Sequence, residues 1–341
     1  MSSIPADVVL HKRAPTEKEV RKILTEAESV WLKTHHHMFM AVDLEFTRNH
    51  FALIQICFDT GRGSDRIRTV YLSNTSFPGL IDLLISPHLV KLVHGSESND
   101  VPWLLSQIPD YQQAELFVNF VDTRFIAEYI NPDLKPGLYD VLVRFGAITT
   151  AQVNELLATE KSLGRIQHVD WRLNKMRDNA IAYAVHDVLH LRTVYTEARR
   201  RDTTIPQFRN ILRVCFMQRF LDTLNKTEVE RVSNYFLERN KLPLMDISTR
   251  IIAVINVPDL DFKRIMRIGW MRPPTQLLLR RIIYGLLVRH VHVMSDKTHQ
   301  FTKVLQPIPD SEMRWSSLDH LIIELRRSVQ HALANKKTLE K

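Results

Sequence analysis

The sequence is poor in glycine and in cysteine, and each shortage excludes a class of site. Its nine glycines make up less than 3% of 341 residues, against a usual share of about 7%. Neither GxGxxG nor GxxxxGK(S/T) occurs, so we expect no Rossmann or P-loop nucleotide site. The two cysteines, Cys57 and Cys215, cannot form a disulfide framework, and no Cys/His spacing resembles that of a zinc site.

Long apolar runs are also missing. No run approaches the roughly 18 residues that a membrane-spanning helix needs, and the first residues lack the apolar core of a signal peptide. We therefore expect an intracellular, reducing environment and no membrane contact. The sequence does not separate nucleus from cytoplasm, and it indicates no oligomeric state. The composition is that of a globular chain, and the length suggests two domains or one domain with a long extension.

Positive charge is in excess and is concentrated in one part of the chain. Residues 201–341 contain 24 Lys and Arg against 14 Asp and Glu, a balance of +10 within a total of +8. The other 22 basic and 24 acidic side chains give residues 1–200 a balance of −2. Such asymmetry indicates a polyanionic partner, most simply nucleic acid, or else an ordinary solvated basic surface.

Alternating strand and helix signals predict an α/β fold with a mixed sheet. Runs rich in β-branched and aromatic residues predict strands at Phe39–Phe46, Phe51–Asp59, Thr69–Leu72, Leu92–His94 and Phe117–Asp122. Helical periodicity predicts helices at about 79–86, 100–107, 123–131, 138–145 and 175–200. The turn residues from Gly61 to Asp65 predict that the first three strands form a meander.

Residues 1–37 are predicted to form an N-terminal helical extension. Thr16 and Glu19 have the spacing of a capping box, and apolar residues from Val20 to Trp31 recur behind them at helical spacing. The residues up to about 14 show no pattern. The three histidines at 35–37 are expected to form a loop, because three adjacent side chains cannot all point at one metal ion.

Two carboxylates stand two residues apart on the first of these strands. Asp43 and Glu45 project from one face, whereas Val42, Leu44 and Phe46 point to the other face and into the core. Like charges side by side in apolar surroundings are costly, and a divalent cation offsets the repulsion. A polar face at a strand edge is the plainer interpretation of the same pattern.

Two further acidic motifs follow along the chain. Asp100 stands where an apolar strand runs through a small polar loop into a helix, although Asp100, Asn99 or Ser98 could equally cap that helix. Tyr183 and Asp187 are four residues apart on a predicted helix, so they lie on one face of it. Each motif alone is also compatible with a purely structural role.

Taken in order, the three motifs resemble those of the DEDD exonuclease superfamily, in the subclass whose last motif carries a tyrosine. Ribonuclease D is among the best-known members of that subclass. The resemblance covers roughly residues 38–200. Three accessory segments agree with it: Leu53–Ile56 on the second strand, Val121–Thr123 before a helix, and Asp170–Arg172 ahead of Tyr183.

Three features depart from the family pattern. The loop from His94 to Asp100 is one residue longer than in typical relatives. Leu173–Met176 stands where the family usually has an Arg-Pro-Leu-like segment. The upstream basic residue of the family is matched by either Lys161 or Arg165, and the spacing does not decide between them. These departures concern contacts with substrate more than the chemistry, because the four acids and the tyrosine are all present.

The resemblance implies a ribonuclease H-like mixed sheet flanked by helices, forming an exonuclease domain over residues 38–203. It also implies a metal-dependent 3′–5′ exonuclease that acts on single-stranded nucleic acid, with RNA slightly favoured, and releases nucleoside monophosphates. In the family pattern Asp43 bridges two Mg²⁺ or Mn²⁺ ions, Glu45 and Asp187 hold the ion that activates water, Asp100 helps to hold the other, and Tyr183 orients the water.

Residues beside the acids are candidate substrate contacts, each with packing or solvation as its alternative role. They are Phe46, His94, Asn99 and Trp103. An aromatic side chain at such a position can stack on a terminal base of any identity.

Residues 204–341 are predicted to form a basic, all-helical region. Basic residues between Lys263 and Arg289 recur among apolar ones at helical spacing, which indicates helices with one buried and one basic face. The stretch from Leu242 to Val293 loosely resembles the HRDC type of nucleic-acid-binding domain; an extension that docks a protein partner is the alternative. For the chain as a whole, the alternative to an enzyme is an inactive nuclease fold used for binding or as a scaffold.

Overall fold

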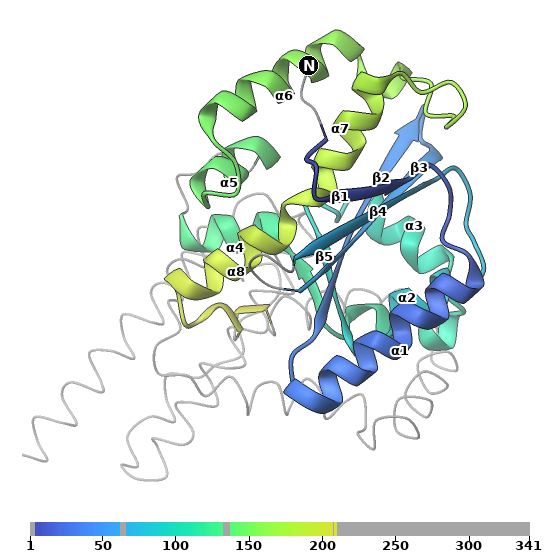
Figure 1. The fold of residues 1–341 in the computed structure, drawn as a ribbon, viewed down its shortest axis with the longest axis vertical. Helices are drawn as coiled ribbons and strands as arrows, with labels where there is room; N and C mark the ends of the chain where they lie inside the picture. The colour runs from blue at the N-terminus through green and yellow to red at the C-terminus, as the bar shows by residue number, and fades with distance from the viewer. Residues whose placement is uncertain (1–3, 62–65, 132–136, 207, 210–341) are drawn as a thin grey trace, which may run out of the picture.

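A six-stranded mixed sheet organises the residues that the computed structural model describes, namely 4–61, 66–131, 137–206, 208 and 209. Figure 1 shows its strands, whose order across the sheet is β1-β4-β3-β2-β5-β6. They are β1 (Val8–His11), β2 (Met38–Thr47), β3 (His50–Thr60), β4 (Ile67–Ser73), β5 (Leu89–Val93) and β6 (Phe120–Asp122). The predicted α/β fold with a mixed sheet is confirmed.

The strand directions follow the predicted meander. β2, β3 and β4 are antiparallel neighbours, while β5 runs parallel to β2 and β6 runs parallel to β5. β1 lies at the edge of the sheet, parallel to β4. The pairing of β2 with β3 shifts register between Glu45 and Phe46, as at a β-bulge. A bulge beside two carboxylates changes the twist of the strand at the point where a site is expected.

Helices lie on both sides of the sheet, as in a ribonuclease H-like fold. In Figure 1, α1 and α2 lie on one side and α7 and α8 on the other. The α-helices are α1 (Glu17–Thr34), α2 (Leu80–Ile85), α3 (Asp100–Ser106), α4 (Thr123–Ile130), α5 (Leu138–Arg144), α6 (Thr150–Leu163), α7 (Asp178–Leu189) and α8 (Leu191–Arg201). Two 3₁₀ turns, η2 (Asp110–Phe117) and η3 (Ile166–His168), complete the described elements.

The N-terminal residues are integrated with the sheet. Thr16 caps α1 through the predicted capping box with Glu19, and Val20 and Ala27 of that helix are buried in the core. β1 was not predicted, because a strand of four residues at the edge of a sheet carries too little pattern. Two side chains of the predicted N-terminal helical extension thus lie in the core of the sheet domain.

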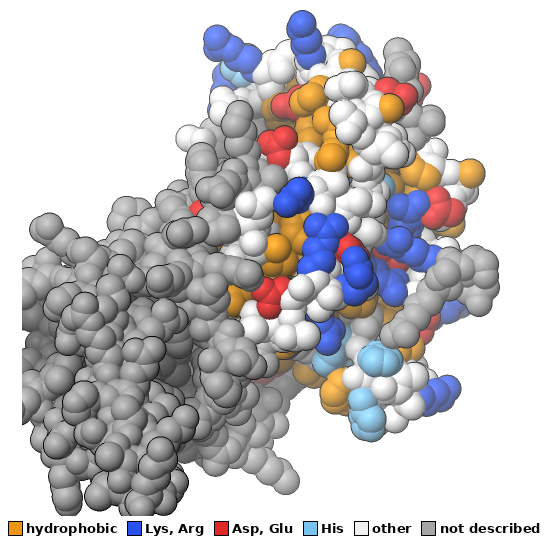
Figure 2. All heavy atoms as spheres, turned by 90° about the vertical axis from the view of Figure 1, so that its left-hand side faces the viewer, with side chains coloured by type: hydrophobic (Ala, Val, Ile, Leu, Met, Phe, Trp, Pro, Cys, Tyr) orange, Lys and Arg blue, Asp and Glu red, His pale blue; other side chains and the backbone are white. Residues whose placement is uncertain are grey.

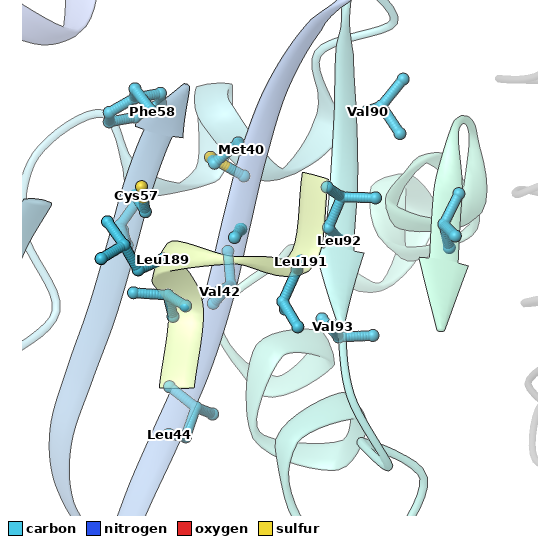
Figure 3. Packing of buried hydrophobic residues seen from close by; sticks show 14 of the residues in the cluster. Met40, Val42, Leu44, Cys57, Phe58, Val90, Leu92, Val93, Leu189 and Leu191 are labelled. Atoms are coloured by element: carbon cyan, nitrogen blue, oxygen red, sulfur yellow. The ribbon is translucent and has the colours of Figure 1, made fainter. Parts of the chain in front are cut away.

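The core lies between the sheet and the junction of α7 with α8. Figure 3 shows how Met40 of β2, Cys57 of β3 and Leu92 of β5 surround Leu189 and Leu191, and each of these side chains is at most 1% exposed. Burial raises the pKa of the Cys57 thiol to about 12, so the thiol stays protonated and packs as a small apolar group. The apolar core thereby fixes β2 relative to α7.

The helix predicted over 175–200 is in fact two helices, which meet at the buried His190. The rings of His186 and His190 are stacked with their centroids 5.6 Å apart. Burial lowers the pKa of His190 to about 3, and the positive charges of His186 and Arg68 act in the same direction. The sequence pattern continues across the break because apolar residues are buried on both sides of it.

Acid is expected to destabilise the fold through His190. Between about pH 6.5 and about pH 3, the unfolded chain binds a proton at this residue that the folded chain excludes. The contribution of His190 to the free energy of unfolding should therefore decrease as pH falls through this window, by up to about 1.4 kcal/mol per pH unit. Urea unfolding at about pH 7 and about pH 5 should show that the same fall in pH leaves His190→Asn relatively more stable than the unsubstituted chain. Equal changes in the two proteins would contradict this assignment.

The surface of the described part shows mixed charge. On the face in Figure 2, Lys and Arg side chains are interspersed with apolar side chains and carboxylates. No helix among the described residues is both long enough and apolar enough to cross a membrane. Nearly all of the basic region predicted at 204–341, including its HRDC-like stretch, lies outside the described residues.

Candidate active site

β2 presents two carboxylates beside each other, as its alternation predicts. Asp43 and Glu45 share one face of the strand, and the intervening Leu44 is buried with 6% of its surface exposed. Glu45 is itself 6% exposed, and its Oε1 accepts a hydrogen bond of 3.4 Å from Gln55 Nε2 of β3. Gln55 stands opposite Asp43 in the strand register, so β3 supports the pair from the side.

α7 adds a third carboxylate to this pair. Asp187, on the buried side of α7, is 7% exposed. One oxygen from each of Asp43, Glu45 and Asp187 lies within 4.8 Å of the other two. The helix therefore brings together residues that stand 142 positions apart in the chain, Glu45 and Asp187.

The three carboxylates cannot all stay ionised in these surroundings without positive charge. Burial raises the pKa of Asp43 to about 7. Burial also raises the pKa of Glu45 well above its usual value, and repulsion by Asp43 and Asp187 raises it further. The pKa of Asp187 is raised by burial and then by Asp43. A cation bound between the three carboxylates would lower all three pKa values.

Asp100, the first residue of α3, lies beside this group and outside the set of three whose oxygens meet within 4.8 Å. Burial and then repulsion by Asp43 raise the pKa of Asp100, and Asp100 in turn raises the pKa of Glu45. Asn99 is exposed and stands at the N-cap, yet its side chain makes no capping hydrogen bond. The structure thus places Asp100 at the edge of the acidic cluster.

The loop before α3 is held in place by Asp122, which is 1% exposed. The backbone N–H groups of Gly95 and Ser96 and the Ser96 hydroxyl each donate to its carboxylate at 3.0 Å. Gly95 has a left-handed φ of 67°, and a Cβ there would lie 3.1 Å from Arg124 Nη1. Asp122 therefore fixes the path of the chain that leads to Asp100.

The tyrosine of α7 lies among the acids. The Tyr183 hydroxyl is near enough to the Asp187 carboxylate to lower the pKa of that group, and the Tyr183 ring lies 6.0 Å from that of the buried Trp171. Burial, followed by repulsion from Asp187 and Glu45, raises the pKa of the phenol. Without a cation in the site, Tyr183 therefore stays protonated and offers one O–H donor.

Two residues near the acids were missed by the sequence reasoning. The Tyr139 hydroxyl of α5 is buried and has no hydrogen-bond partner within the described part of the chain. Burial first, then the charges of Asp187, Glu160 and Glu45, raise its pKa. Glu160 of α6 also raises the pKa of Asp187. No local pattern marks either residue, because only the packing of α6 against α7 and of α5 against α6 brings them near.

The predicted substrate contacts occupy different surroundings. Trp103 stacks on Phe51 with 4.1 Å between ring centroids and 16° between planes, and both are half-buried. His94 Nδ1 lies 3.0 Å from the Thr123 hydroxyl. Phe46 is half-buried against the edge of the core. A contact with nucleic acid stays a prediction for these residues and for Asn99.

The chemistry of the cluster fits a hard divalent cation. Carboxylate oxygens are the ligands that Mg²⁺ and Mn²⁺ prefer, and one oxygen from each of Asp43, Glu45 and Asp187 lies within 4.8 Å of the other two. The neighbours that most affect Glu45 are other acids, so a cation would relieve their repulsion. These three residues could hold one ion, and Asp100 could help to hold a second beside Asp43.

A family model described as "3′-5′ exonuclease" matches residues 19–201, more than half of the chain. The chain belongs to this family of 3′–5′ exonucleases, within the DEDD exonuclease superfamily. The matched span contains β2, α3 and α7, the elements that carry the acidic cluster. It begins within α1, which agrees with the integration of that helix into the exonuclease domain.

The exonuclease chain also resembles a viral protein beyond the matched domain. An uncharacterized protein of Acanthamoeba polyphaga mimivirus is 23% identical over 355 residues, covering 90% of this chain and 69% of the viral one. No solved structure matches the chain. The viral similarity therefore extends past residue 201 into the basic region, which the family model leaves out.

Divalent cations are expected to stabilise the exonuclease domain. A ligand that binds only the folded state adds about 2.7 kcal/mol at a hundred times its Kd, which corresponds to several degrees in melting temperature. Thermal unfolding with Mn²⁺ or Mg²⁺ should show this rise for the unsubstituted chain and for Glu26→Gln, whose side chain is exposed on α1. Asp43→Asn should abolish most of it. An equal rise in all three proteins would place the ions elsewhere.

Proposed function

We propose that the protein is a metal-dependent exonuclease that removes nucleoside monophosphates from the 3′ end of single-stranded nucleic acid, with RNA as the favoured substrate. The observation that carries the proposal is the convergence of Asp43, Glu45 and Asp187 within 4.8 Å in a domain of the 3′–5′ exonuclease family. Hydrolysis of a phosphodiester needs a water nucleophile and neutralisation of charge on the phosphate.

In this proposal, two Mg²⁺ or Mn²⁺ ions would be held by Asp43, Glu45, Asp187 and Asp100 and would activate the water and neutralise the phosphate. Side chains of the protein orient the water and position the metal ligands. Tyr183, kept protonated by its surroundings, has one O–H to donate, either to Asp187 or to the attacking water. Asp122 holds the loop that positions Asp100.

Tyr183 is assigned to orientation and not to proton removal. A general base needs a pKa near the working pH, whereas burial and three neighbouring acids raise the pKa of this phenol above its ordinary value of about 10. We therefore propose that a group other than Tyr183 accepts the proton of the attacking water.

The preference for RNA is tested with matched strands. A 5′-labelled 20-nucleotide RNA and a DNA of the same sequence should both be shortened in Mg²⁺ or Mn²⁺, the RNA faster, and neither should be shortened with chelator. Equal rates, or faster loss of the DNA, would refute the preference while leaving the exonuclease in place. Binding of both strands without shortening under every metal condition would favour an inactive binding module.

A further inference from the structure

A cavity of about 450 Å³ opens at the end of β2, the strand that carries Asp43 and Glu45. Thr47, Arg48, His50, Gln167 and His168 line it. The first three residues belong to the tip of the β2–β3 hairpin, and the other two belong to η3. Two segments far apart in sequence therefore form one pocket.

The cavity is close to the carboxylates along β2. Thr47 follows Glu45 by two residues on this strand, which corresponds to on the order of 7 Å at the usual rise of a strand. The Thr47 hydroxyl donates to the carbonyl oxygen of Val169 at 3.5 Å and so ties the hairpin to the segment after η3. Trp171, two residues after Val169, packs beside Tyr183. The cavity and the acidic cluster thus share supporting elements.

Several side chains around the cavity carry groups that can donate a hydrogen bond to an anion. Arg48, His50, Gln167 and His168 are all exposed, and Arg48 makes no ion pair with any residue in the part of the chain that the structure describes. A guanidinium offers five N–H donors in a planar fork that matches phosphate oxygens. Imidazole N–H groups and a carboxamide add neutral donors around it.

The turn that carries Arg48 is strained. Thr47 pairs with His50, so Arg48 and Asn49 form the two-residue loop of the hairpin, with left-handed φ values of 49° and 67°. Such a loop favours Asn-Gly or Asp-Gly, because both central residues need positive φ. An arginine at the first position costs conformational free energy that asparagine would largely avoid. The turn itself therefore does not explain why this residue is arginine.

We infer that this cavity binds a backbone phosphate of the nucleic-acid strand, one or more nucleotides upstream of the scissile bond. The inference rests on the proposed function, because it takes the strand that the acidic cluster would cut as the ligand. The cluster is negative and repels a polyanion, so a strand needs cationic contacts beside it. Arg48 supplies the charge, and His50, Gln167 and His168 supply further donors.

The experiment measures strand binding by the full chain, with chelator present so that nothing is cut. Fluorescence anisotropy of a labelled 12-nucleotide strand is followed between about 50 and 200 mM salt. Arg48→Asn removes the charge with a residue that suits the turn, so the fold should be kept. Arg21→Asn, at an exposed position on α1, is the matched control.

We expect Arg48→Asn to raise Kd about 10-fold at low salt and to reduce the slope of log Kd against log salt by about 0.7, the value for one phosphate contact on a single strand. Arg21→Asn should change neither quantity. Arg48→Lys should restore the slope, because it restores the charge, but only part of the affinity, because it lacks the fork. An unchanged Kd and slope in Arg48→Asn would overturn the inference.

Failure of this inference and failure of the proposed function give different results. If the unsubstituted chain shortens the strand in metal but Arg48→Asn binds as tightly as it does, the exonuclease stands and the cavity has no part in strand binding. If no strand is shortened in any metal while Kd and slope still depend on Arg48, the phosphate site stands and the exonuclease does not.

Discussion

Asp187→Asn is expected to reduce the rate of 3′ shortening by at least about 1000-fold, because residues of a metal site act as a unit. The substitution keeps the size of the side chain and removes one of the three carboxylates that meet within 4.8 Å. The rate is measured on a 5′-labelled strand at saturating Mg²⁺ or Mn²⁺. Glu26→Gln, which removes an exposed carboxylate from α1, should leave the rate unchanged.

The folded state of Asp187→Asn should survive in chelator and should be at least as stable as that of the unsubstituted chain. Burial and repulsion by Asp43 raise the pKa of Asp187, so removing its charge relieves a cost of folding. Loss of activity would therefore report on the site and not on unfolding. Retention of activity within about 10-fold would mean that Asp187 does not belong to the reacting group.

Asp122→Ala is expected to lower the free energy of unfolding by about 3–5 kcal/mol, measured by urea unfolding. It leaves the backbone donors of Gly95, Ser96 and Arg124 without their acceptor in a buried place. The loop that leads to Asp100 loses its support, so exonuclease activity should fall along with stability.

A second aspartate provides the matched control for this substitution. Asp170 also accepts hydrogen bonds, from the Arg172 guanidinium, but both side chains are exposed. Asp170→Ala should lower the free energy of unfolding by no more than about 1 kcal/mol, the usual upper value for an exposed ion pair. The decrease for Asp122→Asn, which keeps one acceptor oxygen, should lie between those for Asp170→Ala and Asp122→Ala. Equal costs at Asp122 and Asp170 would contradict the role given to the buried carboxylate.

The strand that carries the site could be predicted because its pattern is local. Period-two alternation places Asp43 and Glu45 on one face whatever surrounds them, and the apolar Val42 and Leu44 on the other face are buried as expected. Helix ends marked by caps, such as Thr16 before α1, were equally predictable. The meander of β2, β3 and β4 followed from a turn signal between strong strands.

Features that depend on distant contacts could not be derived from spacing. The approach of Asp187 to Glu45 was expected only through the family resemblance, since 142 residues separate them. Tyr139 and Glu160 join the surroundings of the site through the packing of α5, α6 and α7, which leaves no local trace. The break at His190 was hidden because apolar residues continue through it.

The division of charge along the chain also has a structural counterpart. The near-neutral first part, with its balance of −2, contains a buried acidic cluster that repels a polyanion. Binding of a strand then needs positive charge from elsewhere. We propose that Arg48 at the cavity supplies one such contact, and we expect the +10 balance of residues 201–341 to supply further ones.

The measurement that tests the central claim most directly is a time course on a 5′-labelled single strand with Mn²⁺, Mg²⁺ or chelator. The acidic cluster of a 3′–5′ exonuclease predicts a ladder that shortens one nucleotide at a time from the 3′ end, with release of nucleoside monophosphates. The ladder should appear only with metal and should be absent in Asp187→Asn. Shortening with chelator, products cut from the 5′ end or the interior, or no shortening with either metal would contradict the account.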